Sequence, residues 1–290
     1  MSIRKLLSPT NRRARLLVGL LLGALFCIQC VGTTDAVRNV DGVTVIDGKA
    51  LGQHSPETLA KIKSWAEDDH LALLEYCLAN YDKSYRDYTC TLVKQEKLAG
   101  KLGKAQEISV RFRESPYSVA MAWTKNAPIG DRILYIEGKW DNQMLVRPTN
   151  PFLRKLVGGS VLRDPDGEEA MKNTLRPVNM FGFRRSLENL IEVYQQAKKA
   201  DDLKESFGGY AKVAGRDTVA LVRHLPAEKD YPAHETRTYI DLEYLVPLRV
   251  EGTDWNDQLS CLYEYRDVKL NPGLKADDFT PQSNEMVPPK

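Results

Sequence analysis

The sequence predicts an α+β protein that is mainly β, in which helices cover the apolar face of a curved antiparallel sheet. Two runs of alternating apolar and polar residues, 85–148 and 210–270, are typical of strands that bury one face. Two stretches with apolar residues three and four positions apart, 55–80 and 186–200, predict amphipathic helices. One helix precedes the first run of strands, and the other lies between the two runs.

The first 36 residues form a segment of different composition. Basic residues precede an apolar run at Leu16–Ile28, which is too short for a membrane span, and small residues follow it. This pattern predicts a signal peptide at 1–36, so we expect export to the periplasm or the cell envelope. A lipid anchor at Cys27 or Cys30 is disfavoured because neither cysteine follows a small residue.

Charge and cysteine content limit the partners and cross-links. Without residues 1–36, the chain keeps 36 basic and 38 acidic residues, a net charge of about −2. Because no run of basic residues with interleaved aromatics is present, the sequence argues against nucleic acid as a partner. Cys77, Cys90 and Cys261 are expected to be buried free thiols, and a disulfide from Cys77 to either of the others is the alternative.

The remaining chain is expected to fold as a single domain at 55–280. Residues 37–54 are rich in Gly, Asp and Val and predict a flexible N-terminal arm, and 281–290 predict a C-terminal tail. The alternating pattern stops after Pro148, so a helical insertion is predicted at about 149–206.

The strand pattern defines the side chains that face the interior of the sheet. Those expected to line a hydrophobic ligand site are Tyr88, Leu92, Val110, Phe112, Val119, Met121, Trp123, Tyr263 and Tyr265. The helices either fill the space above this face or leave a cavity there. A filled face favours a scaffold with a solid core, and a cavity favours a carrier.

The helical insertion begins with an apolar segment that contains two basic residues. Its apolar residues, Phe152, Leu153, Leu156 and Val157, surround Arg154 and Lys155. We expect this segment to control entry as a lid or to contact a membrane. The alternative is a loop packed over one end of the sheet.

Arg184 and Arg185 stand just before the second helix, where positive charge opposes the helix dipole. A bound phosphate or carboxylate head group would offset this repulsion. Two solvated arginines, or ion pairs with Glu188 or Glu192, need no ligand, and this second interpretation is favoured.

The sequence predicts no catalytic residue, no cofactor and no metal site. Its four histidines lack metal-ligand spacing, and no nucleophile motif or Walker loop is present. The segment from Asp164 to Glu169 has part of the pattern of a calcium loop, but its remaining acidic ligands are misplaced. An enzyme that uses Asp164, Asp166 or His224 is the third and least supported hypothesis.

Three passages carry a family resemblance. They are Tyr88–Gln95 with Gly100, Ser115–Val119 with Trp123, and Tyr239–Asp241 with Pro247–Arg249, Asn271–Leu274 and Phe279. Together they resemble an uncharacterised family of exported bacterial proteins, a domain of unknown function, which is grouped with the LolA/LolB lipoprotein carriers. The resemblance covers roughly residues 59–279.

The resemblance to the carriers implies an unclosed half-barrel whose concave apolar face is capped by helices. The caps would be 55–80 and 168–200, and acyl chains would occupy the space beneath them. No functional residue of the carriers can be placed on a position of this sequence.

We therefore predict a non-enzymatic exported protein that binds a hydrophobic or lipid-like ligand in a half-barrel cavity. It is expected to be a monomer that carries lipids or lipoproteins and makes transient contacts with a membrane or an envelope protein. The alternative is a structural or protein-interaction module of the cell envelope with a solid core and no ligand.

Overall fold

The computed structural model describes residues 42–48, 51, 55–227 and 229–288. The predicted signal peptide, including Cys27 and Cys30, lies outside the described residues, and so do parts of the predicted arm. Within the described ranges, no helix is both long enough and apolar enough to cross a membrane.

The first predicted helix is divided into two. Helix α1 (Pro56–Asp68) begins at a Ser55 cap, whose hydroxyl accepts a hydrogen bond from the Thr58 N–H. Asp69 has non-helical backbone angles and ends α1. Its carboxylate then accepts from the Ala72 N–H and caps α2 (His70–Ser84), so the break at Asp69 follows from a second capping residue.

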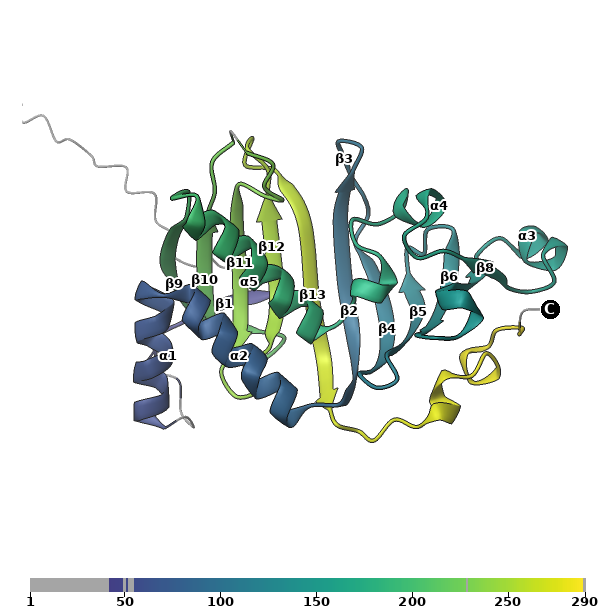
Figure 1. The fold of residues 1–290 in the computed structure, drawn as a ribbon, viewed down its shortest axis with the longest axis horizontal. Helices are drawn as coiled ribbons and strands as arrows, with labels where there is room; N and C mark the ends of the chain where they lie inside the picture. The colour runs from purple at the N-terminus through teal and green to yellow at the C-terminus, as the bar shows by residue number, and fades with distance from the viewer. Residues whose placement is uncertain (1–41, 49–50, 52–54, 228, 289–290) are drawn as a thin grey trace, which may run out of the picture. The chain divides into compact units, whose positions relative to one another are not determined.

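In the described part of the chain, thirteen strands form one antiparallel sheet, and both predicted runs of strands are confirmed. The sheet order is β1-β9-β10-β11-β12-β13-β2-β4-β5-β6-β7-β8, with β3 paired to β2, and its described ends do not pair, so the sheet is open (Figure 1). The strands are β1 (Val43–Ile46), β2 (Asp87–Leu98), β3 (Lys101–Leu102), β4 (Gln106–Arg113), β5 (Ser118–Lys125), β6 (Gly130–Ile136), β7 (Met144–Pro148), β8 (Val161–Arg163), β9 (Lys204–Val213), β10 (Arg216–His224), β11 (Glu235–Asp241), β12 (Pro247–Thr253) and β13 (Leu259–Leu270).

Two pairings connect segments that are distant in the chain. Strand β13 lies beside β2, with Tyr265 opposite Leu92, and joins the two runs into a single sheet. Strand β1, which falls within the predicted arm, pairs with β9 from Val43 to Ile46. Strand β8 falls within the predicted helical insertion and pairs with β7.

One face of the sheet carries the long helices. Helix α5 (Phe183–Lys199) starts three residues before the predicted helix, and α5 and α2 run across the strands from β9 to β13 (Figure 1). Phe183 is fully buried, with its ring centroid 4.7 Å from that of Tyr88 and 4.6 Å from that of Tyr265. The inserted segment also contains α3 (Pro151–Leu156), α4 (Glu168–Met171) and the short 3-10 helix η3 (Val178–Met180).

The C-terminal segment covers the opposite face of strands β5 to β7. Consecutive strand residues point to opposite faces, so Ala120 and Leu134 point away from the helices. They pack with Phe279 and Met286, which are both buried. The predicted tail at 281–290 is therefore attached to the sheet as far as it is described.

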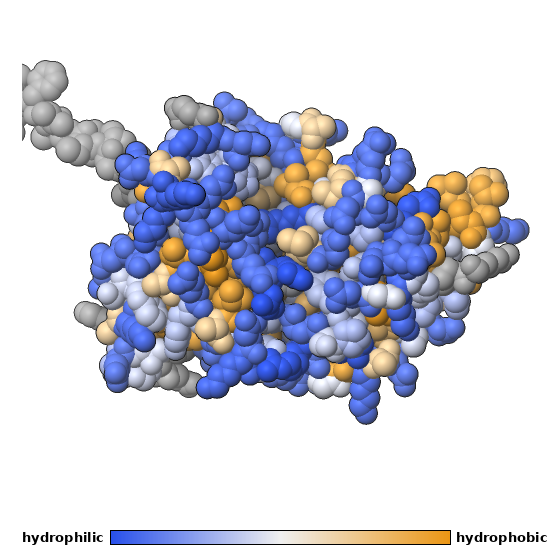
Figure 2. All heavy atoms as spheres, in the orientation of Figure 1, coloured by the Kyte–Doolittle hydropathy of each residue, from blue (hydrophilic) through white to orange (hydrophobic). Residues whose placement is uncertain are grey.

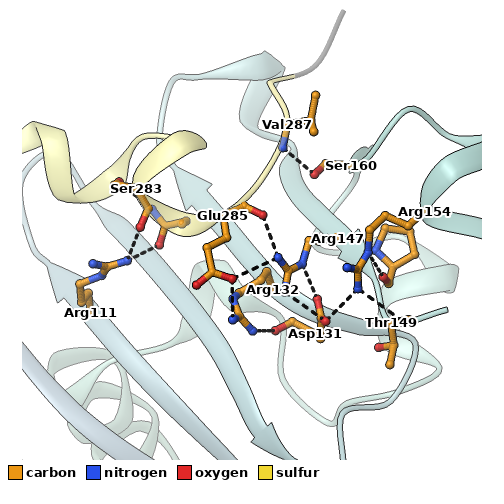
Figure 3. Close-up of polar contacts among 12 residues, drawn as sticks. Arg111, Asp131, Arg132, Arg147, Thr149, Arg154, Ser160, Ser283, Glu285 and Val287 are labelled. Atoms are coloured by element: carbon orange, nitrogen blue, oxygen red, sulfur yellow. Dashed lines mark hydrogen bonds and ion pairs between the residues drawn. The ribbon is translucent and has the colours of Figure 1, made fainter. Parts of the chain in front are cut away.

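Charged side chains fasten this segment and α3 to the same two strands (Figure 3). Arg147 donates to both carboxylate oxygens of Asp131, at 2.8 and 3.2 Å, and to the Glu285 carbonyl at 2.9 Å. Arg154 of α3 also donates to Asp131, at 3.0 Å. Gly159 lies against Val287, because a Cβ atom at Gly159 would meet the valine side chain at 2.3 Å. One carboxylate thus holds both α3 and, through Arg147, the C-terminal segment.

This arrangement predicts an acid dependence of stability that passes through Asp131. Burial opposes ionisation of Asp131, but the hydrogen bonds and charges of Arg147 and Arg154 outweigh burial and hold the pKa of the carboxyl below its usual range. A pKa that is lower in the folded chain stabilises the fold above the unfolded pKa of about 4, and this stabilisation is lost as the pH falls through the folded value.

We therefore expect the urea midpoint of the wild type to fall more between about pH 6 and about pH 3 than that of Asp131→Asn. Chemical denaturation of both proteins at each pH measures the difference. Parallel pH profiles would show that Asp131 is not the titrating group.

Candidate functional site

A cavity of about 340 Å³ lies between the helix-bearing face of the sheet and the inserted segment. Strands β2, β4 to β7, β12 and β13 form one wall, and α3, β8, α4, η3 and α5 contribute the rest. The apolar side chains that line it are Leu92, Ile108, Met121, Trp123, Ile129, Ile133, Met144, Val146, Leu153, Val157, Val161, Ala170, Val178, Met180, Phe181, Leu190, Val250, Tyr263 and Tyr265.

The predicted lining residues divide into two groups along the strands. Five of them line the cavity, namely Leu92, Met121, Trp123, Tyr263 and Tyr265. The other four are packed in the core beyond the cavity, and they are Tyr88, Val110, Phe112 and Val119. The predicted residues therefore lie in two places on the same face.

The physical reason is that aromatic side chains from the inserted segment fill one end of this face. Tyr88, Phe112 and Val119 lie side by side in one row across β2, β4 and β5. Leu92 lies four residues further along β2, which is about 13 Å. Phe183 and Phe181 pack over the first row, at 4.7 Å from Tyr88 and 6.0 Å from Phe112 between ring centroids.

Gly182 permits this close packing at the start of α5. Its φ of +115° lies in a region that other residues rarely adopt, and a Cβ atom there would lie 3.0 Å from the Phe112 ring. The chain can therefore place aromatic rings on both sides of Gly182 directly against the sheet.

The predicted entry segment forms α3 and presents two apolar faces. The Asn150 side chain accepts hydrogen bonds from the Phe152 and Leu153 N–H groups and starts the helix. Leu153 and Val157 line the cavity. Phe152 and Leu156 do not line it and are 73% and 72% exposed.

A group of polar side chains from β2 and β13 lines the cavity, and the sequence reasoning missed it. Glu96 is 4% exposed and accepts a hydrogen bond from the Tyr263 hydroxyl at 2.6 Å. Its Oε2 atom lies 3.0 Å from Lys94 Nζ, and Lys94 also donates to the Thr174 hydroxyl at 2.9 Å. The sequence contained a signal for this group, because Lys94 and Glu96 follow Leu92 at intervals of two residues on β2 and therefore share its inward face.

Burial and a neighbouring charge fix the protonation of Tyr263 beside the cavity. Burial and the Glu96 carboxylate raise the pKa of Tyr263, so its hydroxyl stays protonated and donates to Glu96. Glu96 Oε2 receives no well-aligned hydrogen bond from any described residue. Trp123 is fixed nearby, since its indole N–H donates to Gln106 at 2.7 Å. Glu96 Oε2 itself is buried beside Lys94, so the ion pair of Lys94 and Glu96 sets the charge of this part of the lining.

Two arginines that were considered for anion binding have acidic partners. Arg184 Nε lies 2.8 Å from Asp82 Oδ1, and a second ion pair joins Arg184 to Glu188. Arg185 lies 3.2 Å from the same Glu188. Neither arginine lines the cavity. These contacts match the favoured interpretation as ion pairs.

The acidic residues and the histidine of the enzyme hypothesis are spread over different elements. Asp164 accepts a hydrogen bond from the Asp166 N–H, and Asp166 accepts from Asn179. His224 lies on β10 and contacts Glu235 at 3.0 Å. Among the described residues, no three His, Cys, Asp or Glu side chains are grouped as metal ligands.

Solved structures with a similar fold were found at low sequence identity. The MucA/MucB complex of Pseudomonas aeruginosa matches with 12% identity and a TM-score of 0.45 over 75% of this chain and 63% of that one, so this chain spans less than two thirds of its length. The lipoprotein LppX of Mycobacterium tuberculosis matches with 12% identity and a TM-score of 0.42 over 73% and 100%.

A LolA superfamily protein from Nitrosomonas europaea matches with 10% identity and a TM-score of 0.32 over 72% of this chain and 98% of that one. All three scores are below 0.5, so these likenesses assign neither a ligand nor a partner to this chain. No curated protein matches the sequence. A family model does match, over residues 85–287, and it covers the cavity walls from β2 to β13. The chain therefore belongs to the DUF1571 family, which is described as proteins of unknown function.

Proposed function

We propose that this protein binds a hydrophobic or lipid-like molecule in the cavity of its open sheet, as an exported carrier without catalytic activity. The observation that supports this proposal is the cavity of about 340 Å³, whose walls are mainly apolar side chains from both the sheet and its cover. Small-molecule sites have volumes of roughly 300–1,000 Å³ and combine apolar walls with a few polar groups. A scaffold with a solid core would have no need for this volume.

The distribution of polar groups on the walls supports one orientation for an amphipathic ligand. Ile133, Met144 and Val146 of β6 and β7 give the β7 side of the cavity an apolar surface. The side formed by β2 and β13 carries Glu96 and Tyr263. An amphipathic molecule would therefore place its hydrocarbon part against β6 and β7 and its polar part toward Lys94, Glu96 and Tyr263.

Saturable binding of a fluorescent fatty acid to the delipidated protein tests this proposal. We expect one bound probe per chain, displaced by unlabelled fatty acid, and a matching mass increase in native mass spectrometry of the protein before delipidation. A protein that shows neither bound lipid nor saturable uptake would contradict the carrier function.

A substitution that fills the cavity is predicted to weaken ligand binding, and the same substitution outside the cavity is its control. Ala170 lines the cavity from α4, and Ala170→Phe is expected to weaken binding of the probe by at least about tenfold because the ring occupies the ligand volume. Glu168→Phe adds the same ring at an exposed position of the same helix and should leave the affinity unchanged. Equal affinities of the two variants would place the ligand elsewhere.

A further inference from the structure

Helix α3 presents an apolar surface to solvent at the edge of the cavity. We define the α3 patch as Ile129, Phe152, Leu153, Leu156 and Val157, which are 61%, 73%, 43%, 72% and 39% exposed. Figure 2 shows the apolar side chains of this region gathered at the right, where Figure 1 places α3. Exposed apolar groups of this kind mark contact sites in soluble proteins.

The charge around the α3 patch indicates the kind of partner that it would bind. Residues 142–163 contain Arg147, Arg154, Lys155 and Arg163 and no acidic residue. Arg147 and Arg154 are paired with Asp131. Lys155 and Arg163 form no ion pair with a described residue, so two positive charges accompany the exposed apolar side chains. Apolar side chains beside unpaired basic ones are the composition that binds anionic lipid surfaces.

The small size of the patch argues against a protein partner. A stable protein interface needs roughly 800 Å² from each partner. The patch comes from one helix of six residues and its flanks. A bilayer requires less area, because a few apolar side chains can insert among the acyl chains while basic residues stay at the head groups.

We propose that α3 docks this protein onto a lipid bilayer that contains anionic phospholipids. Phe152 and Leu156 insert into the interface, and Lys155 and Arg163 contact the phosphate groups. Leu153 and Val157 belong to the same patch and line the cavity, so docking brings the cavity to the bilayer surface. An apolar molecule can then pass between bilayer and cavity along α3 with little exposure to water. The docking itself does not depend on whether the cavity takes a ligand.

Sedimentation with vesicles of phosphatidylglycerol and phosphatidylcholine tests the docking. We expect Phe152→Ser combined with Leu156→Ser to weaken binding by at least about tenfold, because two inserting side chains are removed. Binding of the wild type should also fall with added salt and on vesicles of pure phosphatidylcholine. All proteins compared carry the same residues 1–36, so differences report on α3.

The control removes exposed apolar side chains elsewhere. Val45 on β1 and Leu102 on β3 are 41% and 40% exposed and lie away from α3 (Figure 1). Val45→Ser combined with Leu102→Ser should sediment like the wild type. Equal binding of all three proteins, or equal loss in both double variants, would overturn the proposal. So would a shift from dimer to monomer in the α3 variant, since the patch would then join two copies of the chain.

Two further measurements complete the test, namely the fluorescence of Phe152→Trp and the fatty-acid binding of the variants. Phe152→Trp should shift its emission to shorter wavelength on vesicles and be quenched by brominated lipid, after the spectrum of the wild type is subtracted. Unchanged emission would contradict insertion. Fatty-acid binding should be normal in the double variant at Phe152 and Leu156, because neither residue lines the cavity. Vesicle binding should conversely persist in Ala170→Phe.

Discussion

Replacing Phe183 with alanine is expected to lower the free energy of unfolding by about 3–5 kcal/mol. Phe183 is fully buried at the start of α5, and its ring contacts those of Tyr88 and Tyr265 at centroid distances of 4.7 and 4.6 Å. Truncation removes both aromatic contacts and leaves an empty volume beside Gly182, where the chain has little freedom to move inward.

Urea denaturation followed by circular dichroism measures this change. The matched control is Phe152→Ala, which removes the same ring from a side chain that is 73% exposed and should change the free energy of unfolding by no more than about 0.5 kcal/mol. If the two variants were equally stable, the aromatic cluster would not be what holds α5 on the sheet.

Replacing Glu264 with glutamine is expected to lower the free energy of unfolding by about 3 kcal/mol. Glu264 is 1% exposed and forms ion pairs with Arg249, which is also buried, and with Arg266. The amide cannot neutralise the buried guanidinium, which would keep its ion pair with Glu251 but lose the charge of Glu264. The cost is therefore expected at the lower end of the range for a broken buried pair.

The pair of Arg249 and Glu264 lies on the face of the sheet opposite the cavity, so its loss should change stability and not ligand binding. Arg249 lies opposite Glu264, whereas their neighbours Val250 and Tyr263 point to the other face and line the cavity. Glu264→Gln should thus lower the denaturation midpoint without changing the affinity for a fatty-acid probe below that midpoint. The exposed pair of Glu107 and Lys125 offers a control, and Glu107→Gln should leave the midpoint nearly unchanged. A wild-type midpoint for Glu264→Gln would refute the role of the buried pair.

Local patterns allowed most strands and both long helices to be predicted. The alternation in β2 placed Leu92 on the inward face, and the spacing in 186–200 predicted most of α5. The structure divides the first helix at Asp69, whose carboxylate caps α2. The early start of α5 was not predicted, because Phe183 joins the helix through tertiary packing on Tyr88 and Tyr265.

The candidate site was predicted only in part. Period-two alternation assigns a residue to a face but does not say what covers that residue along the strand. Tyr88 and Leu92 therefore received the same assignment, although Phe183 covers the first and the cavity lies above the second. The polar group in the lining was missed for the related reason that Lys94 and Glu96 are polar residues on an inward face.

The sequence by itself determined most of the strands, the long helices, the apolar face of those strands and the place of the inserted segment, because these follow from contacts between near neighbours in the chain. Only the tertiary structure decided that β13 pairs with β2, that the C-terminal segment covers the outer face, and that part of the inner face stays open. These features depend on how side chains from distant segments fit together. Phe181 and Phe183 fill one end of the face, and the cavity lies beside them with Phe181 in its wall.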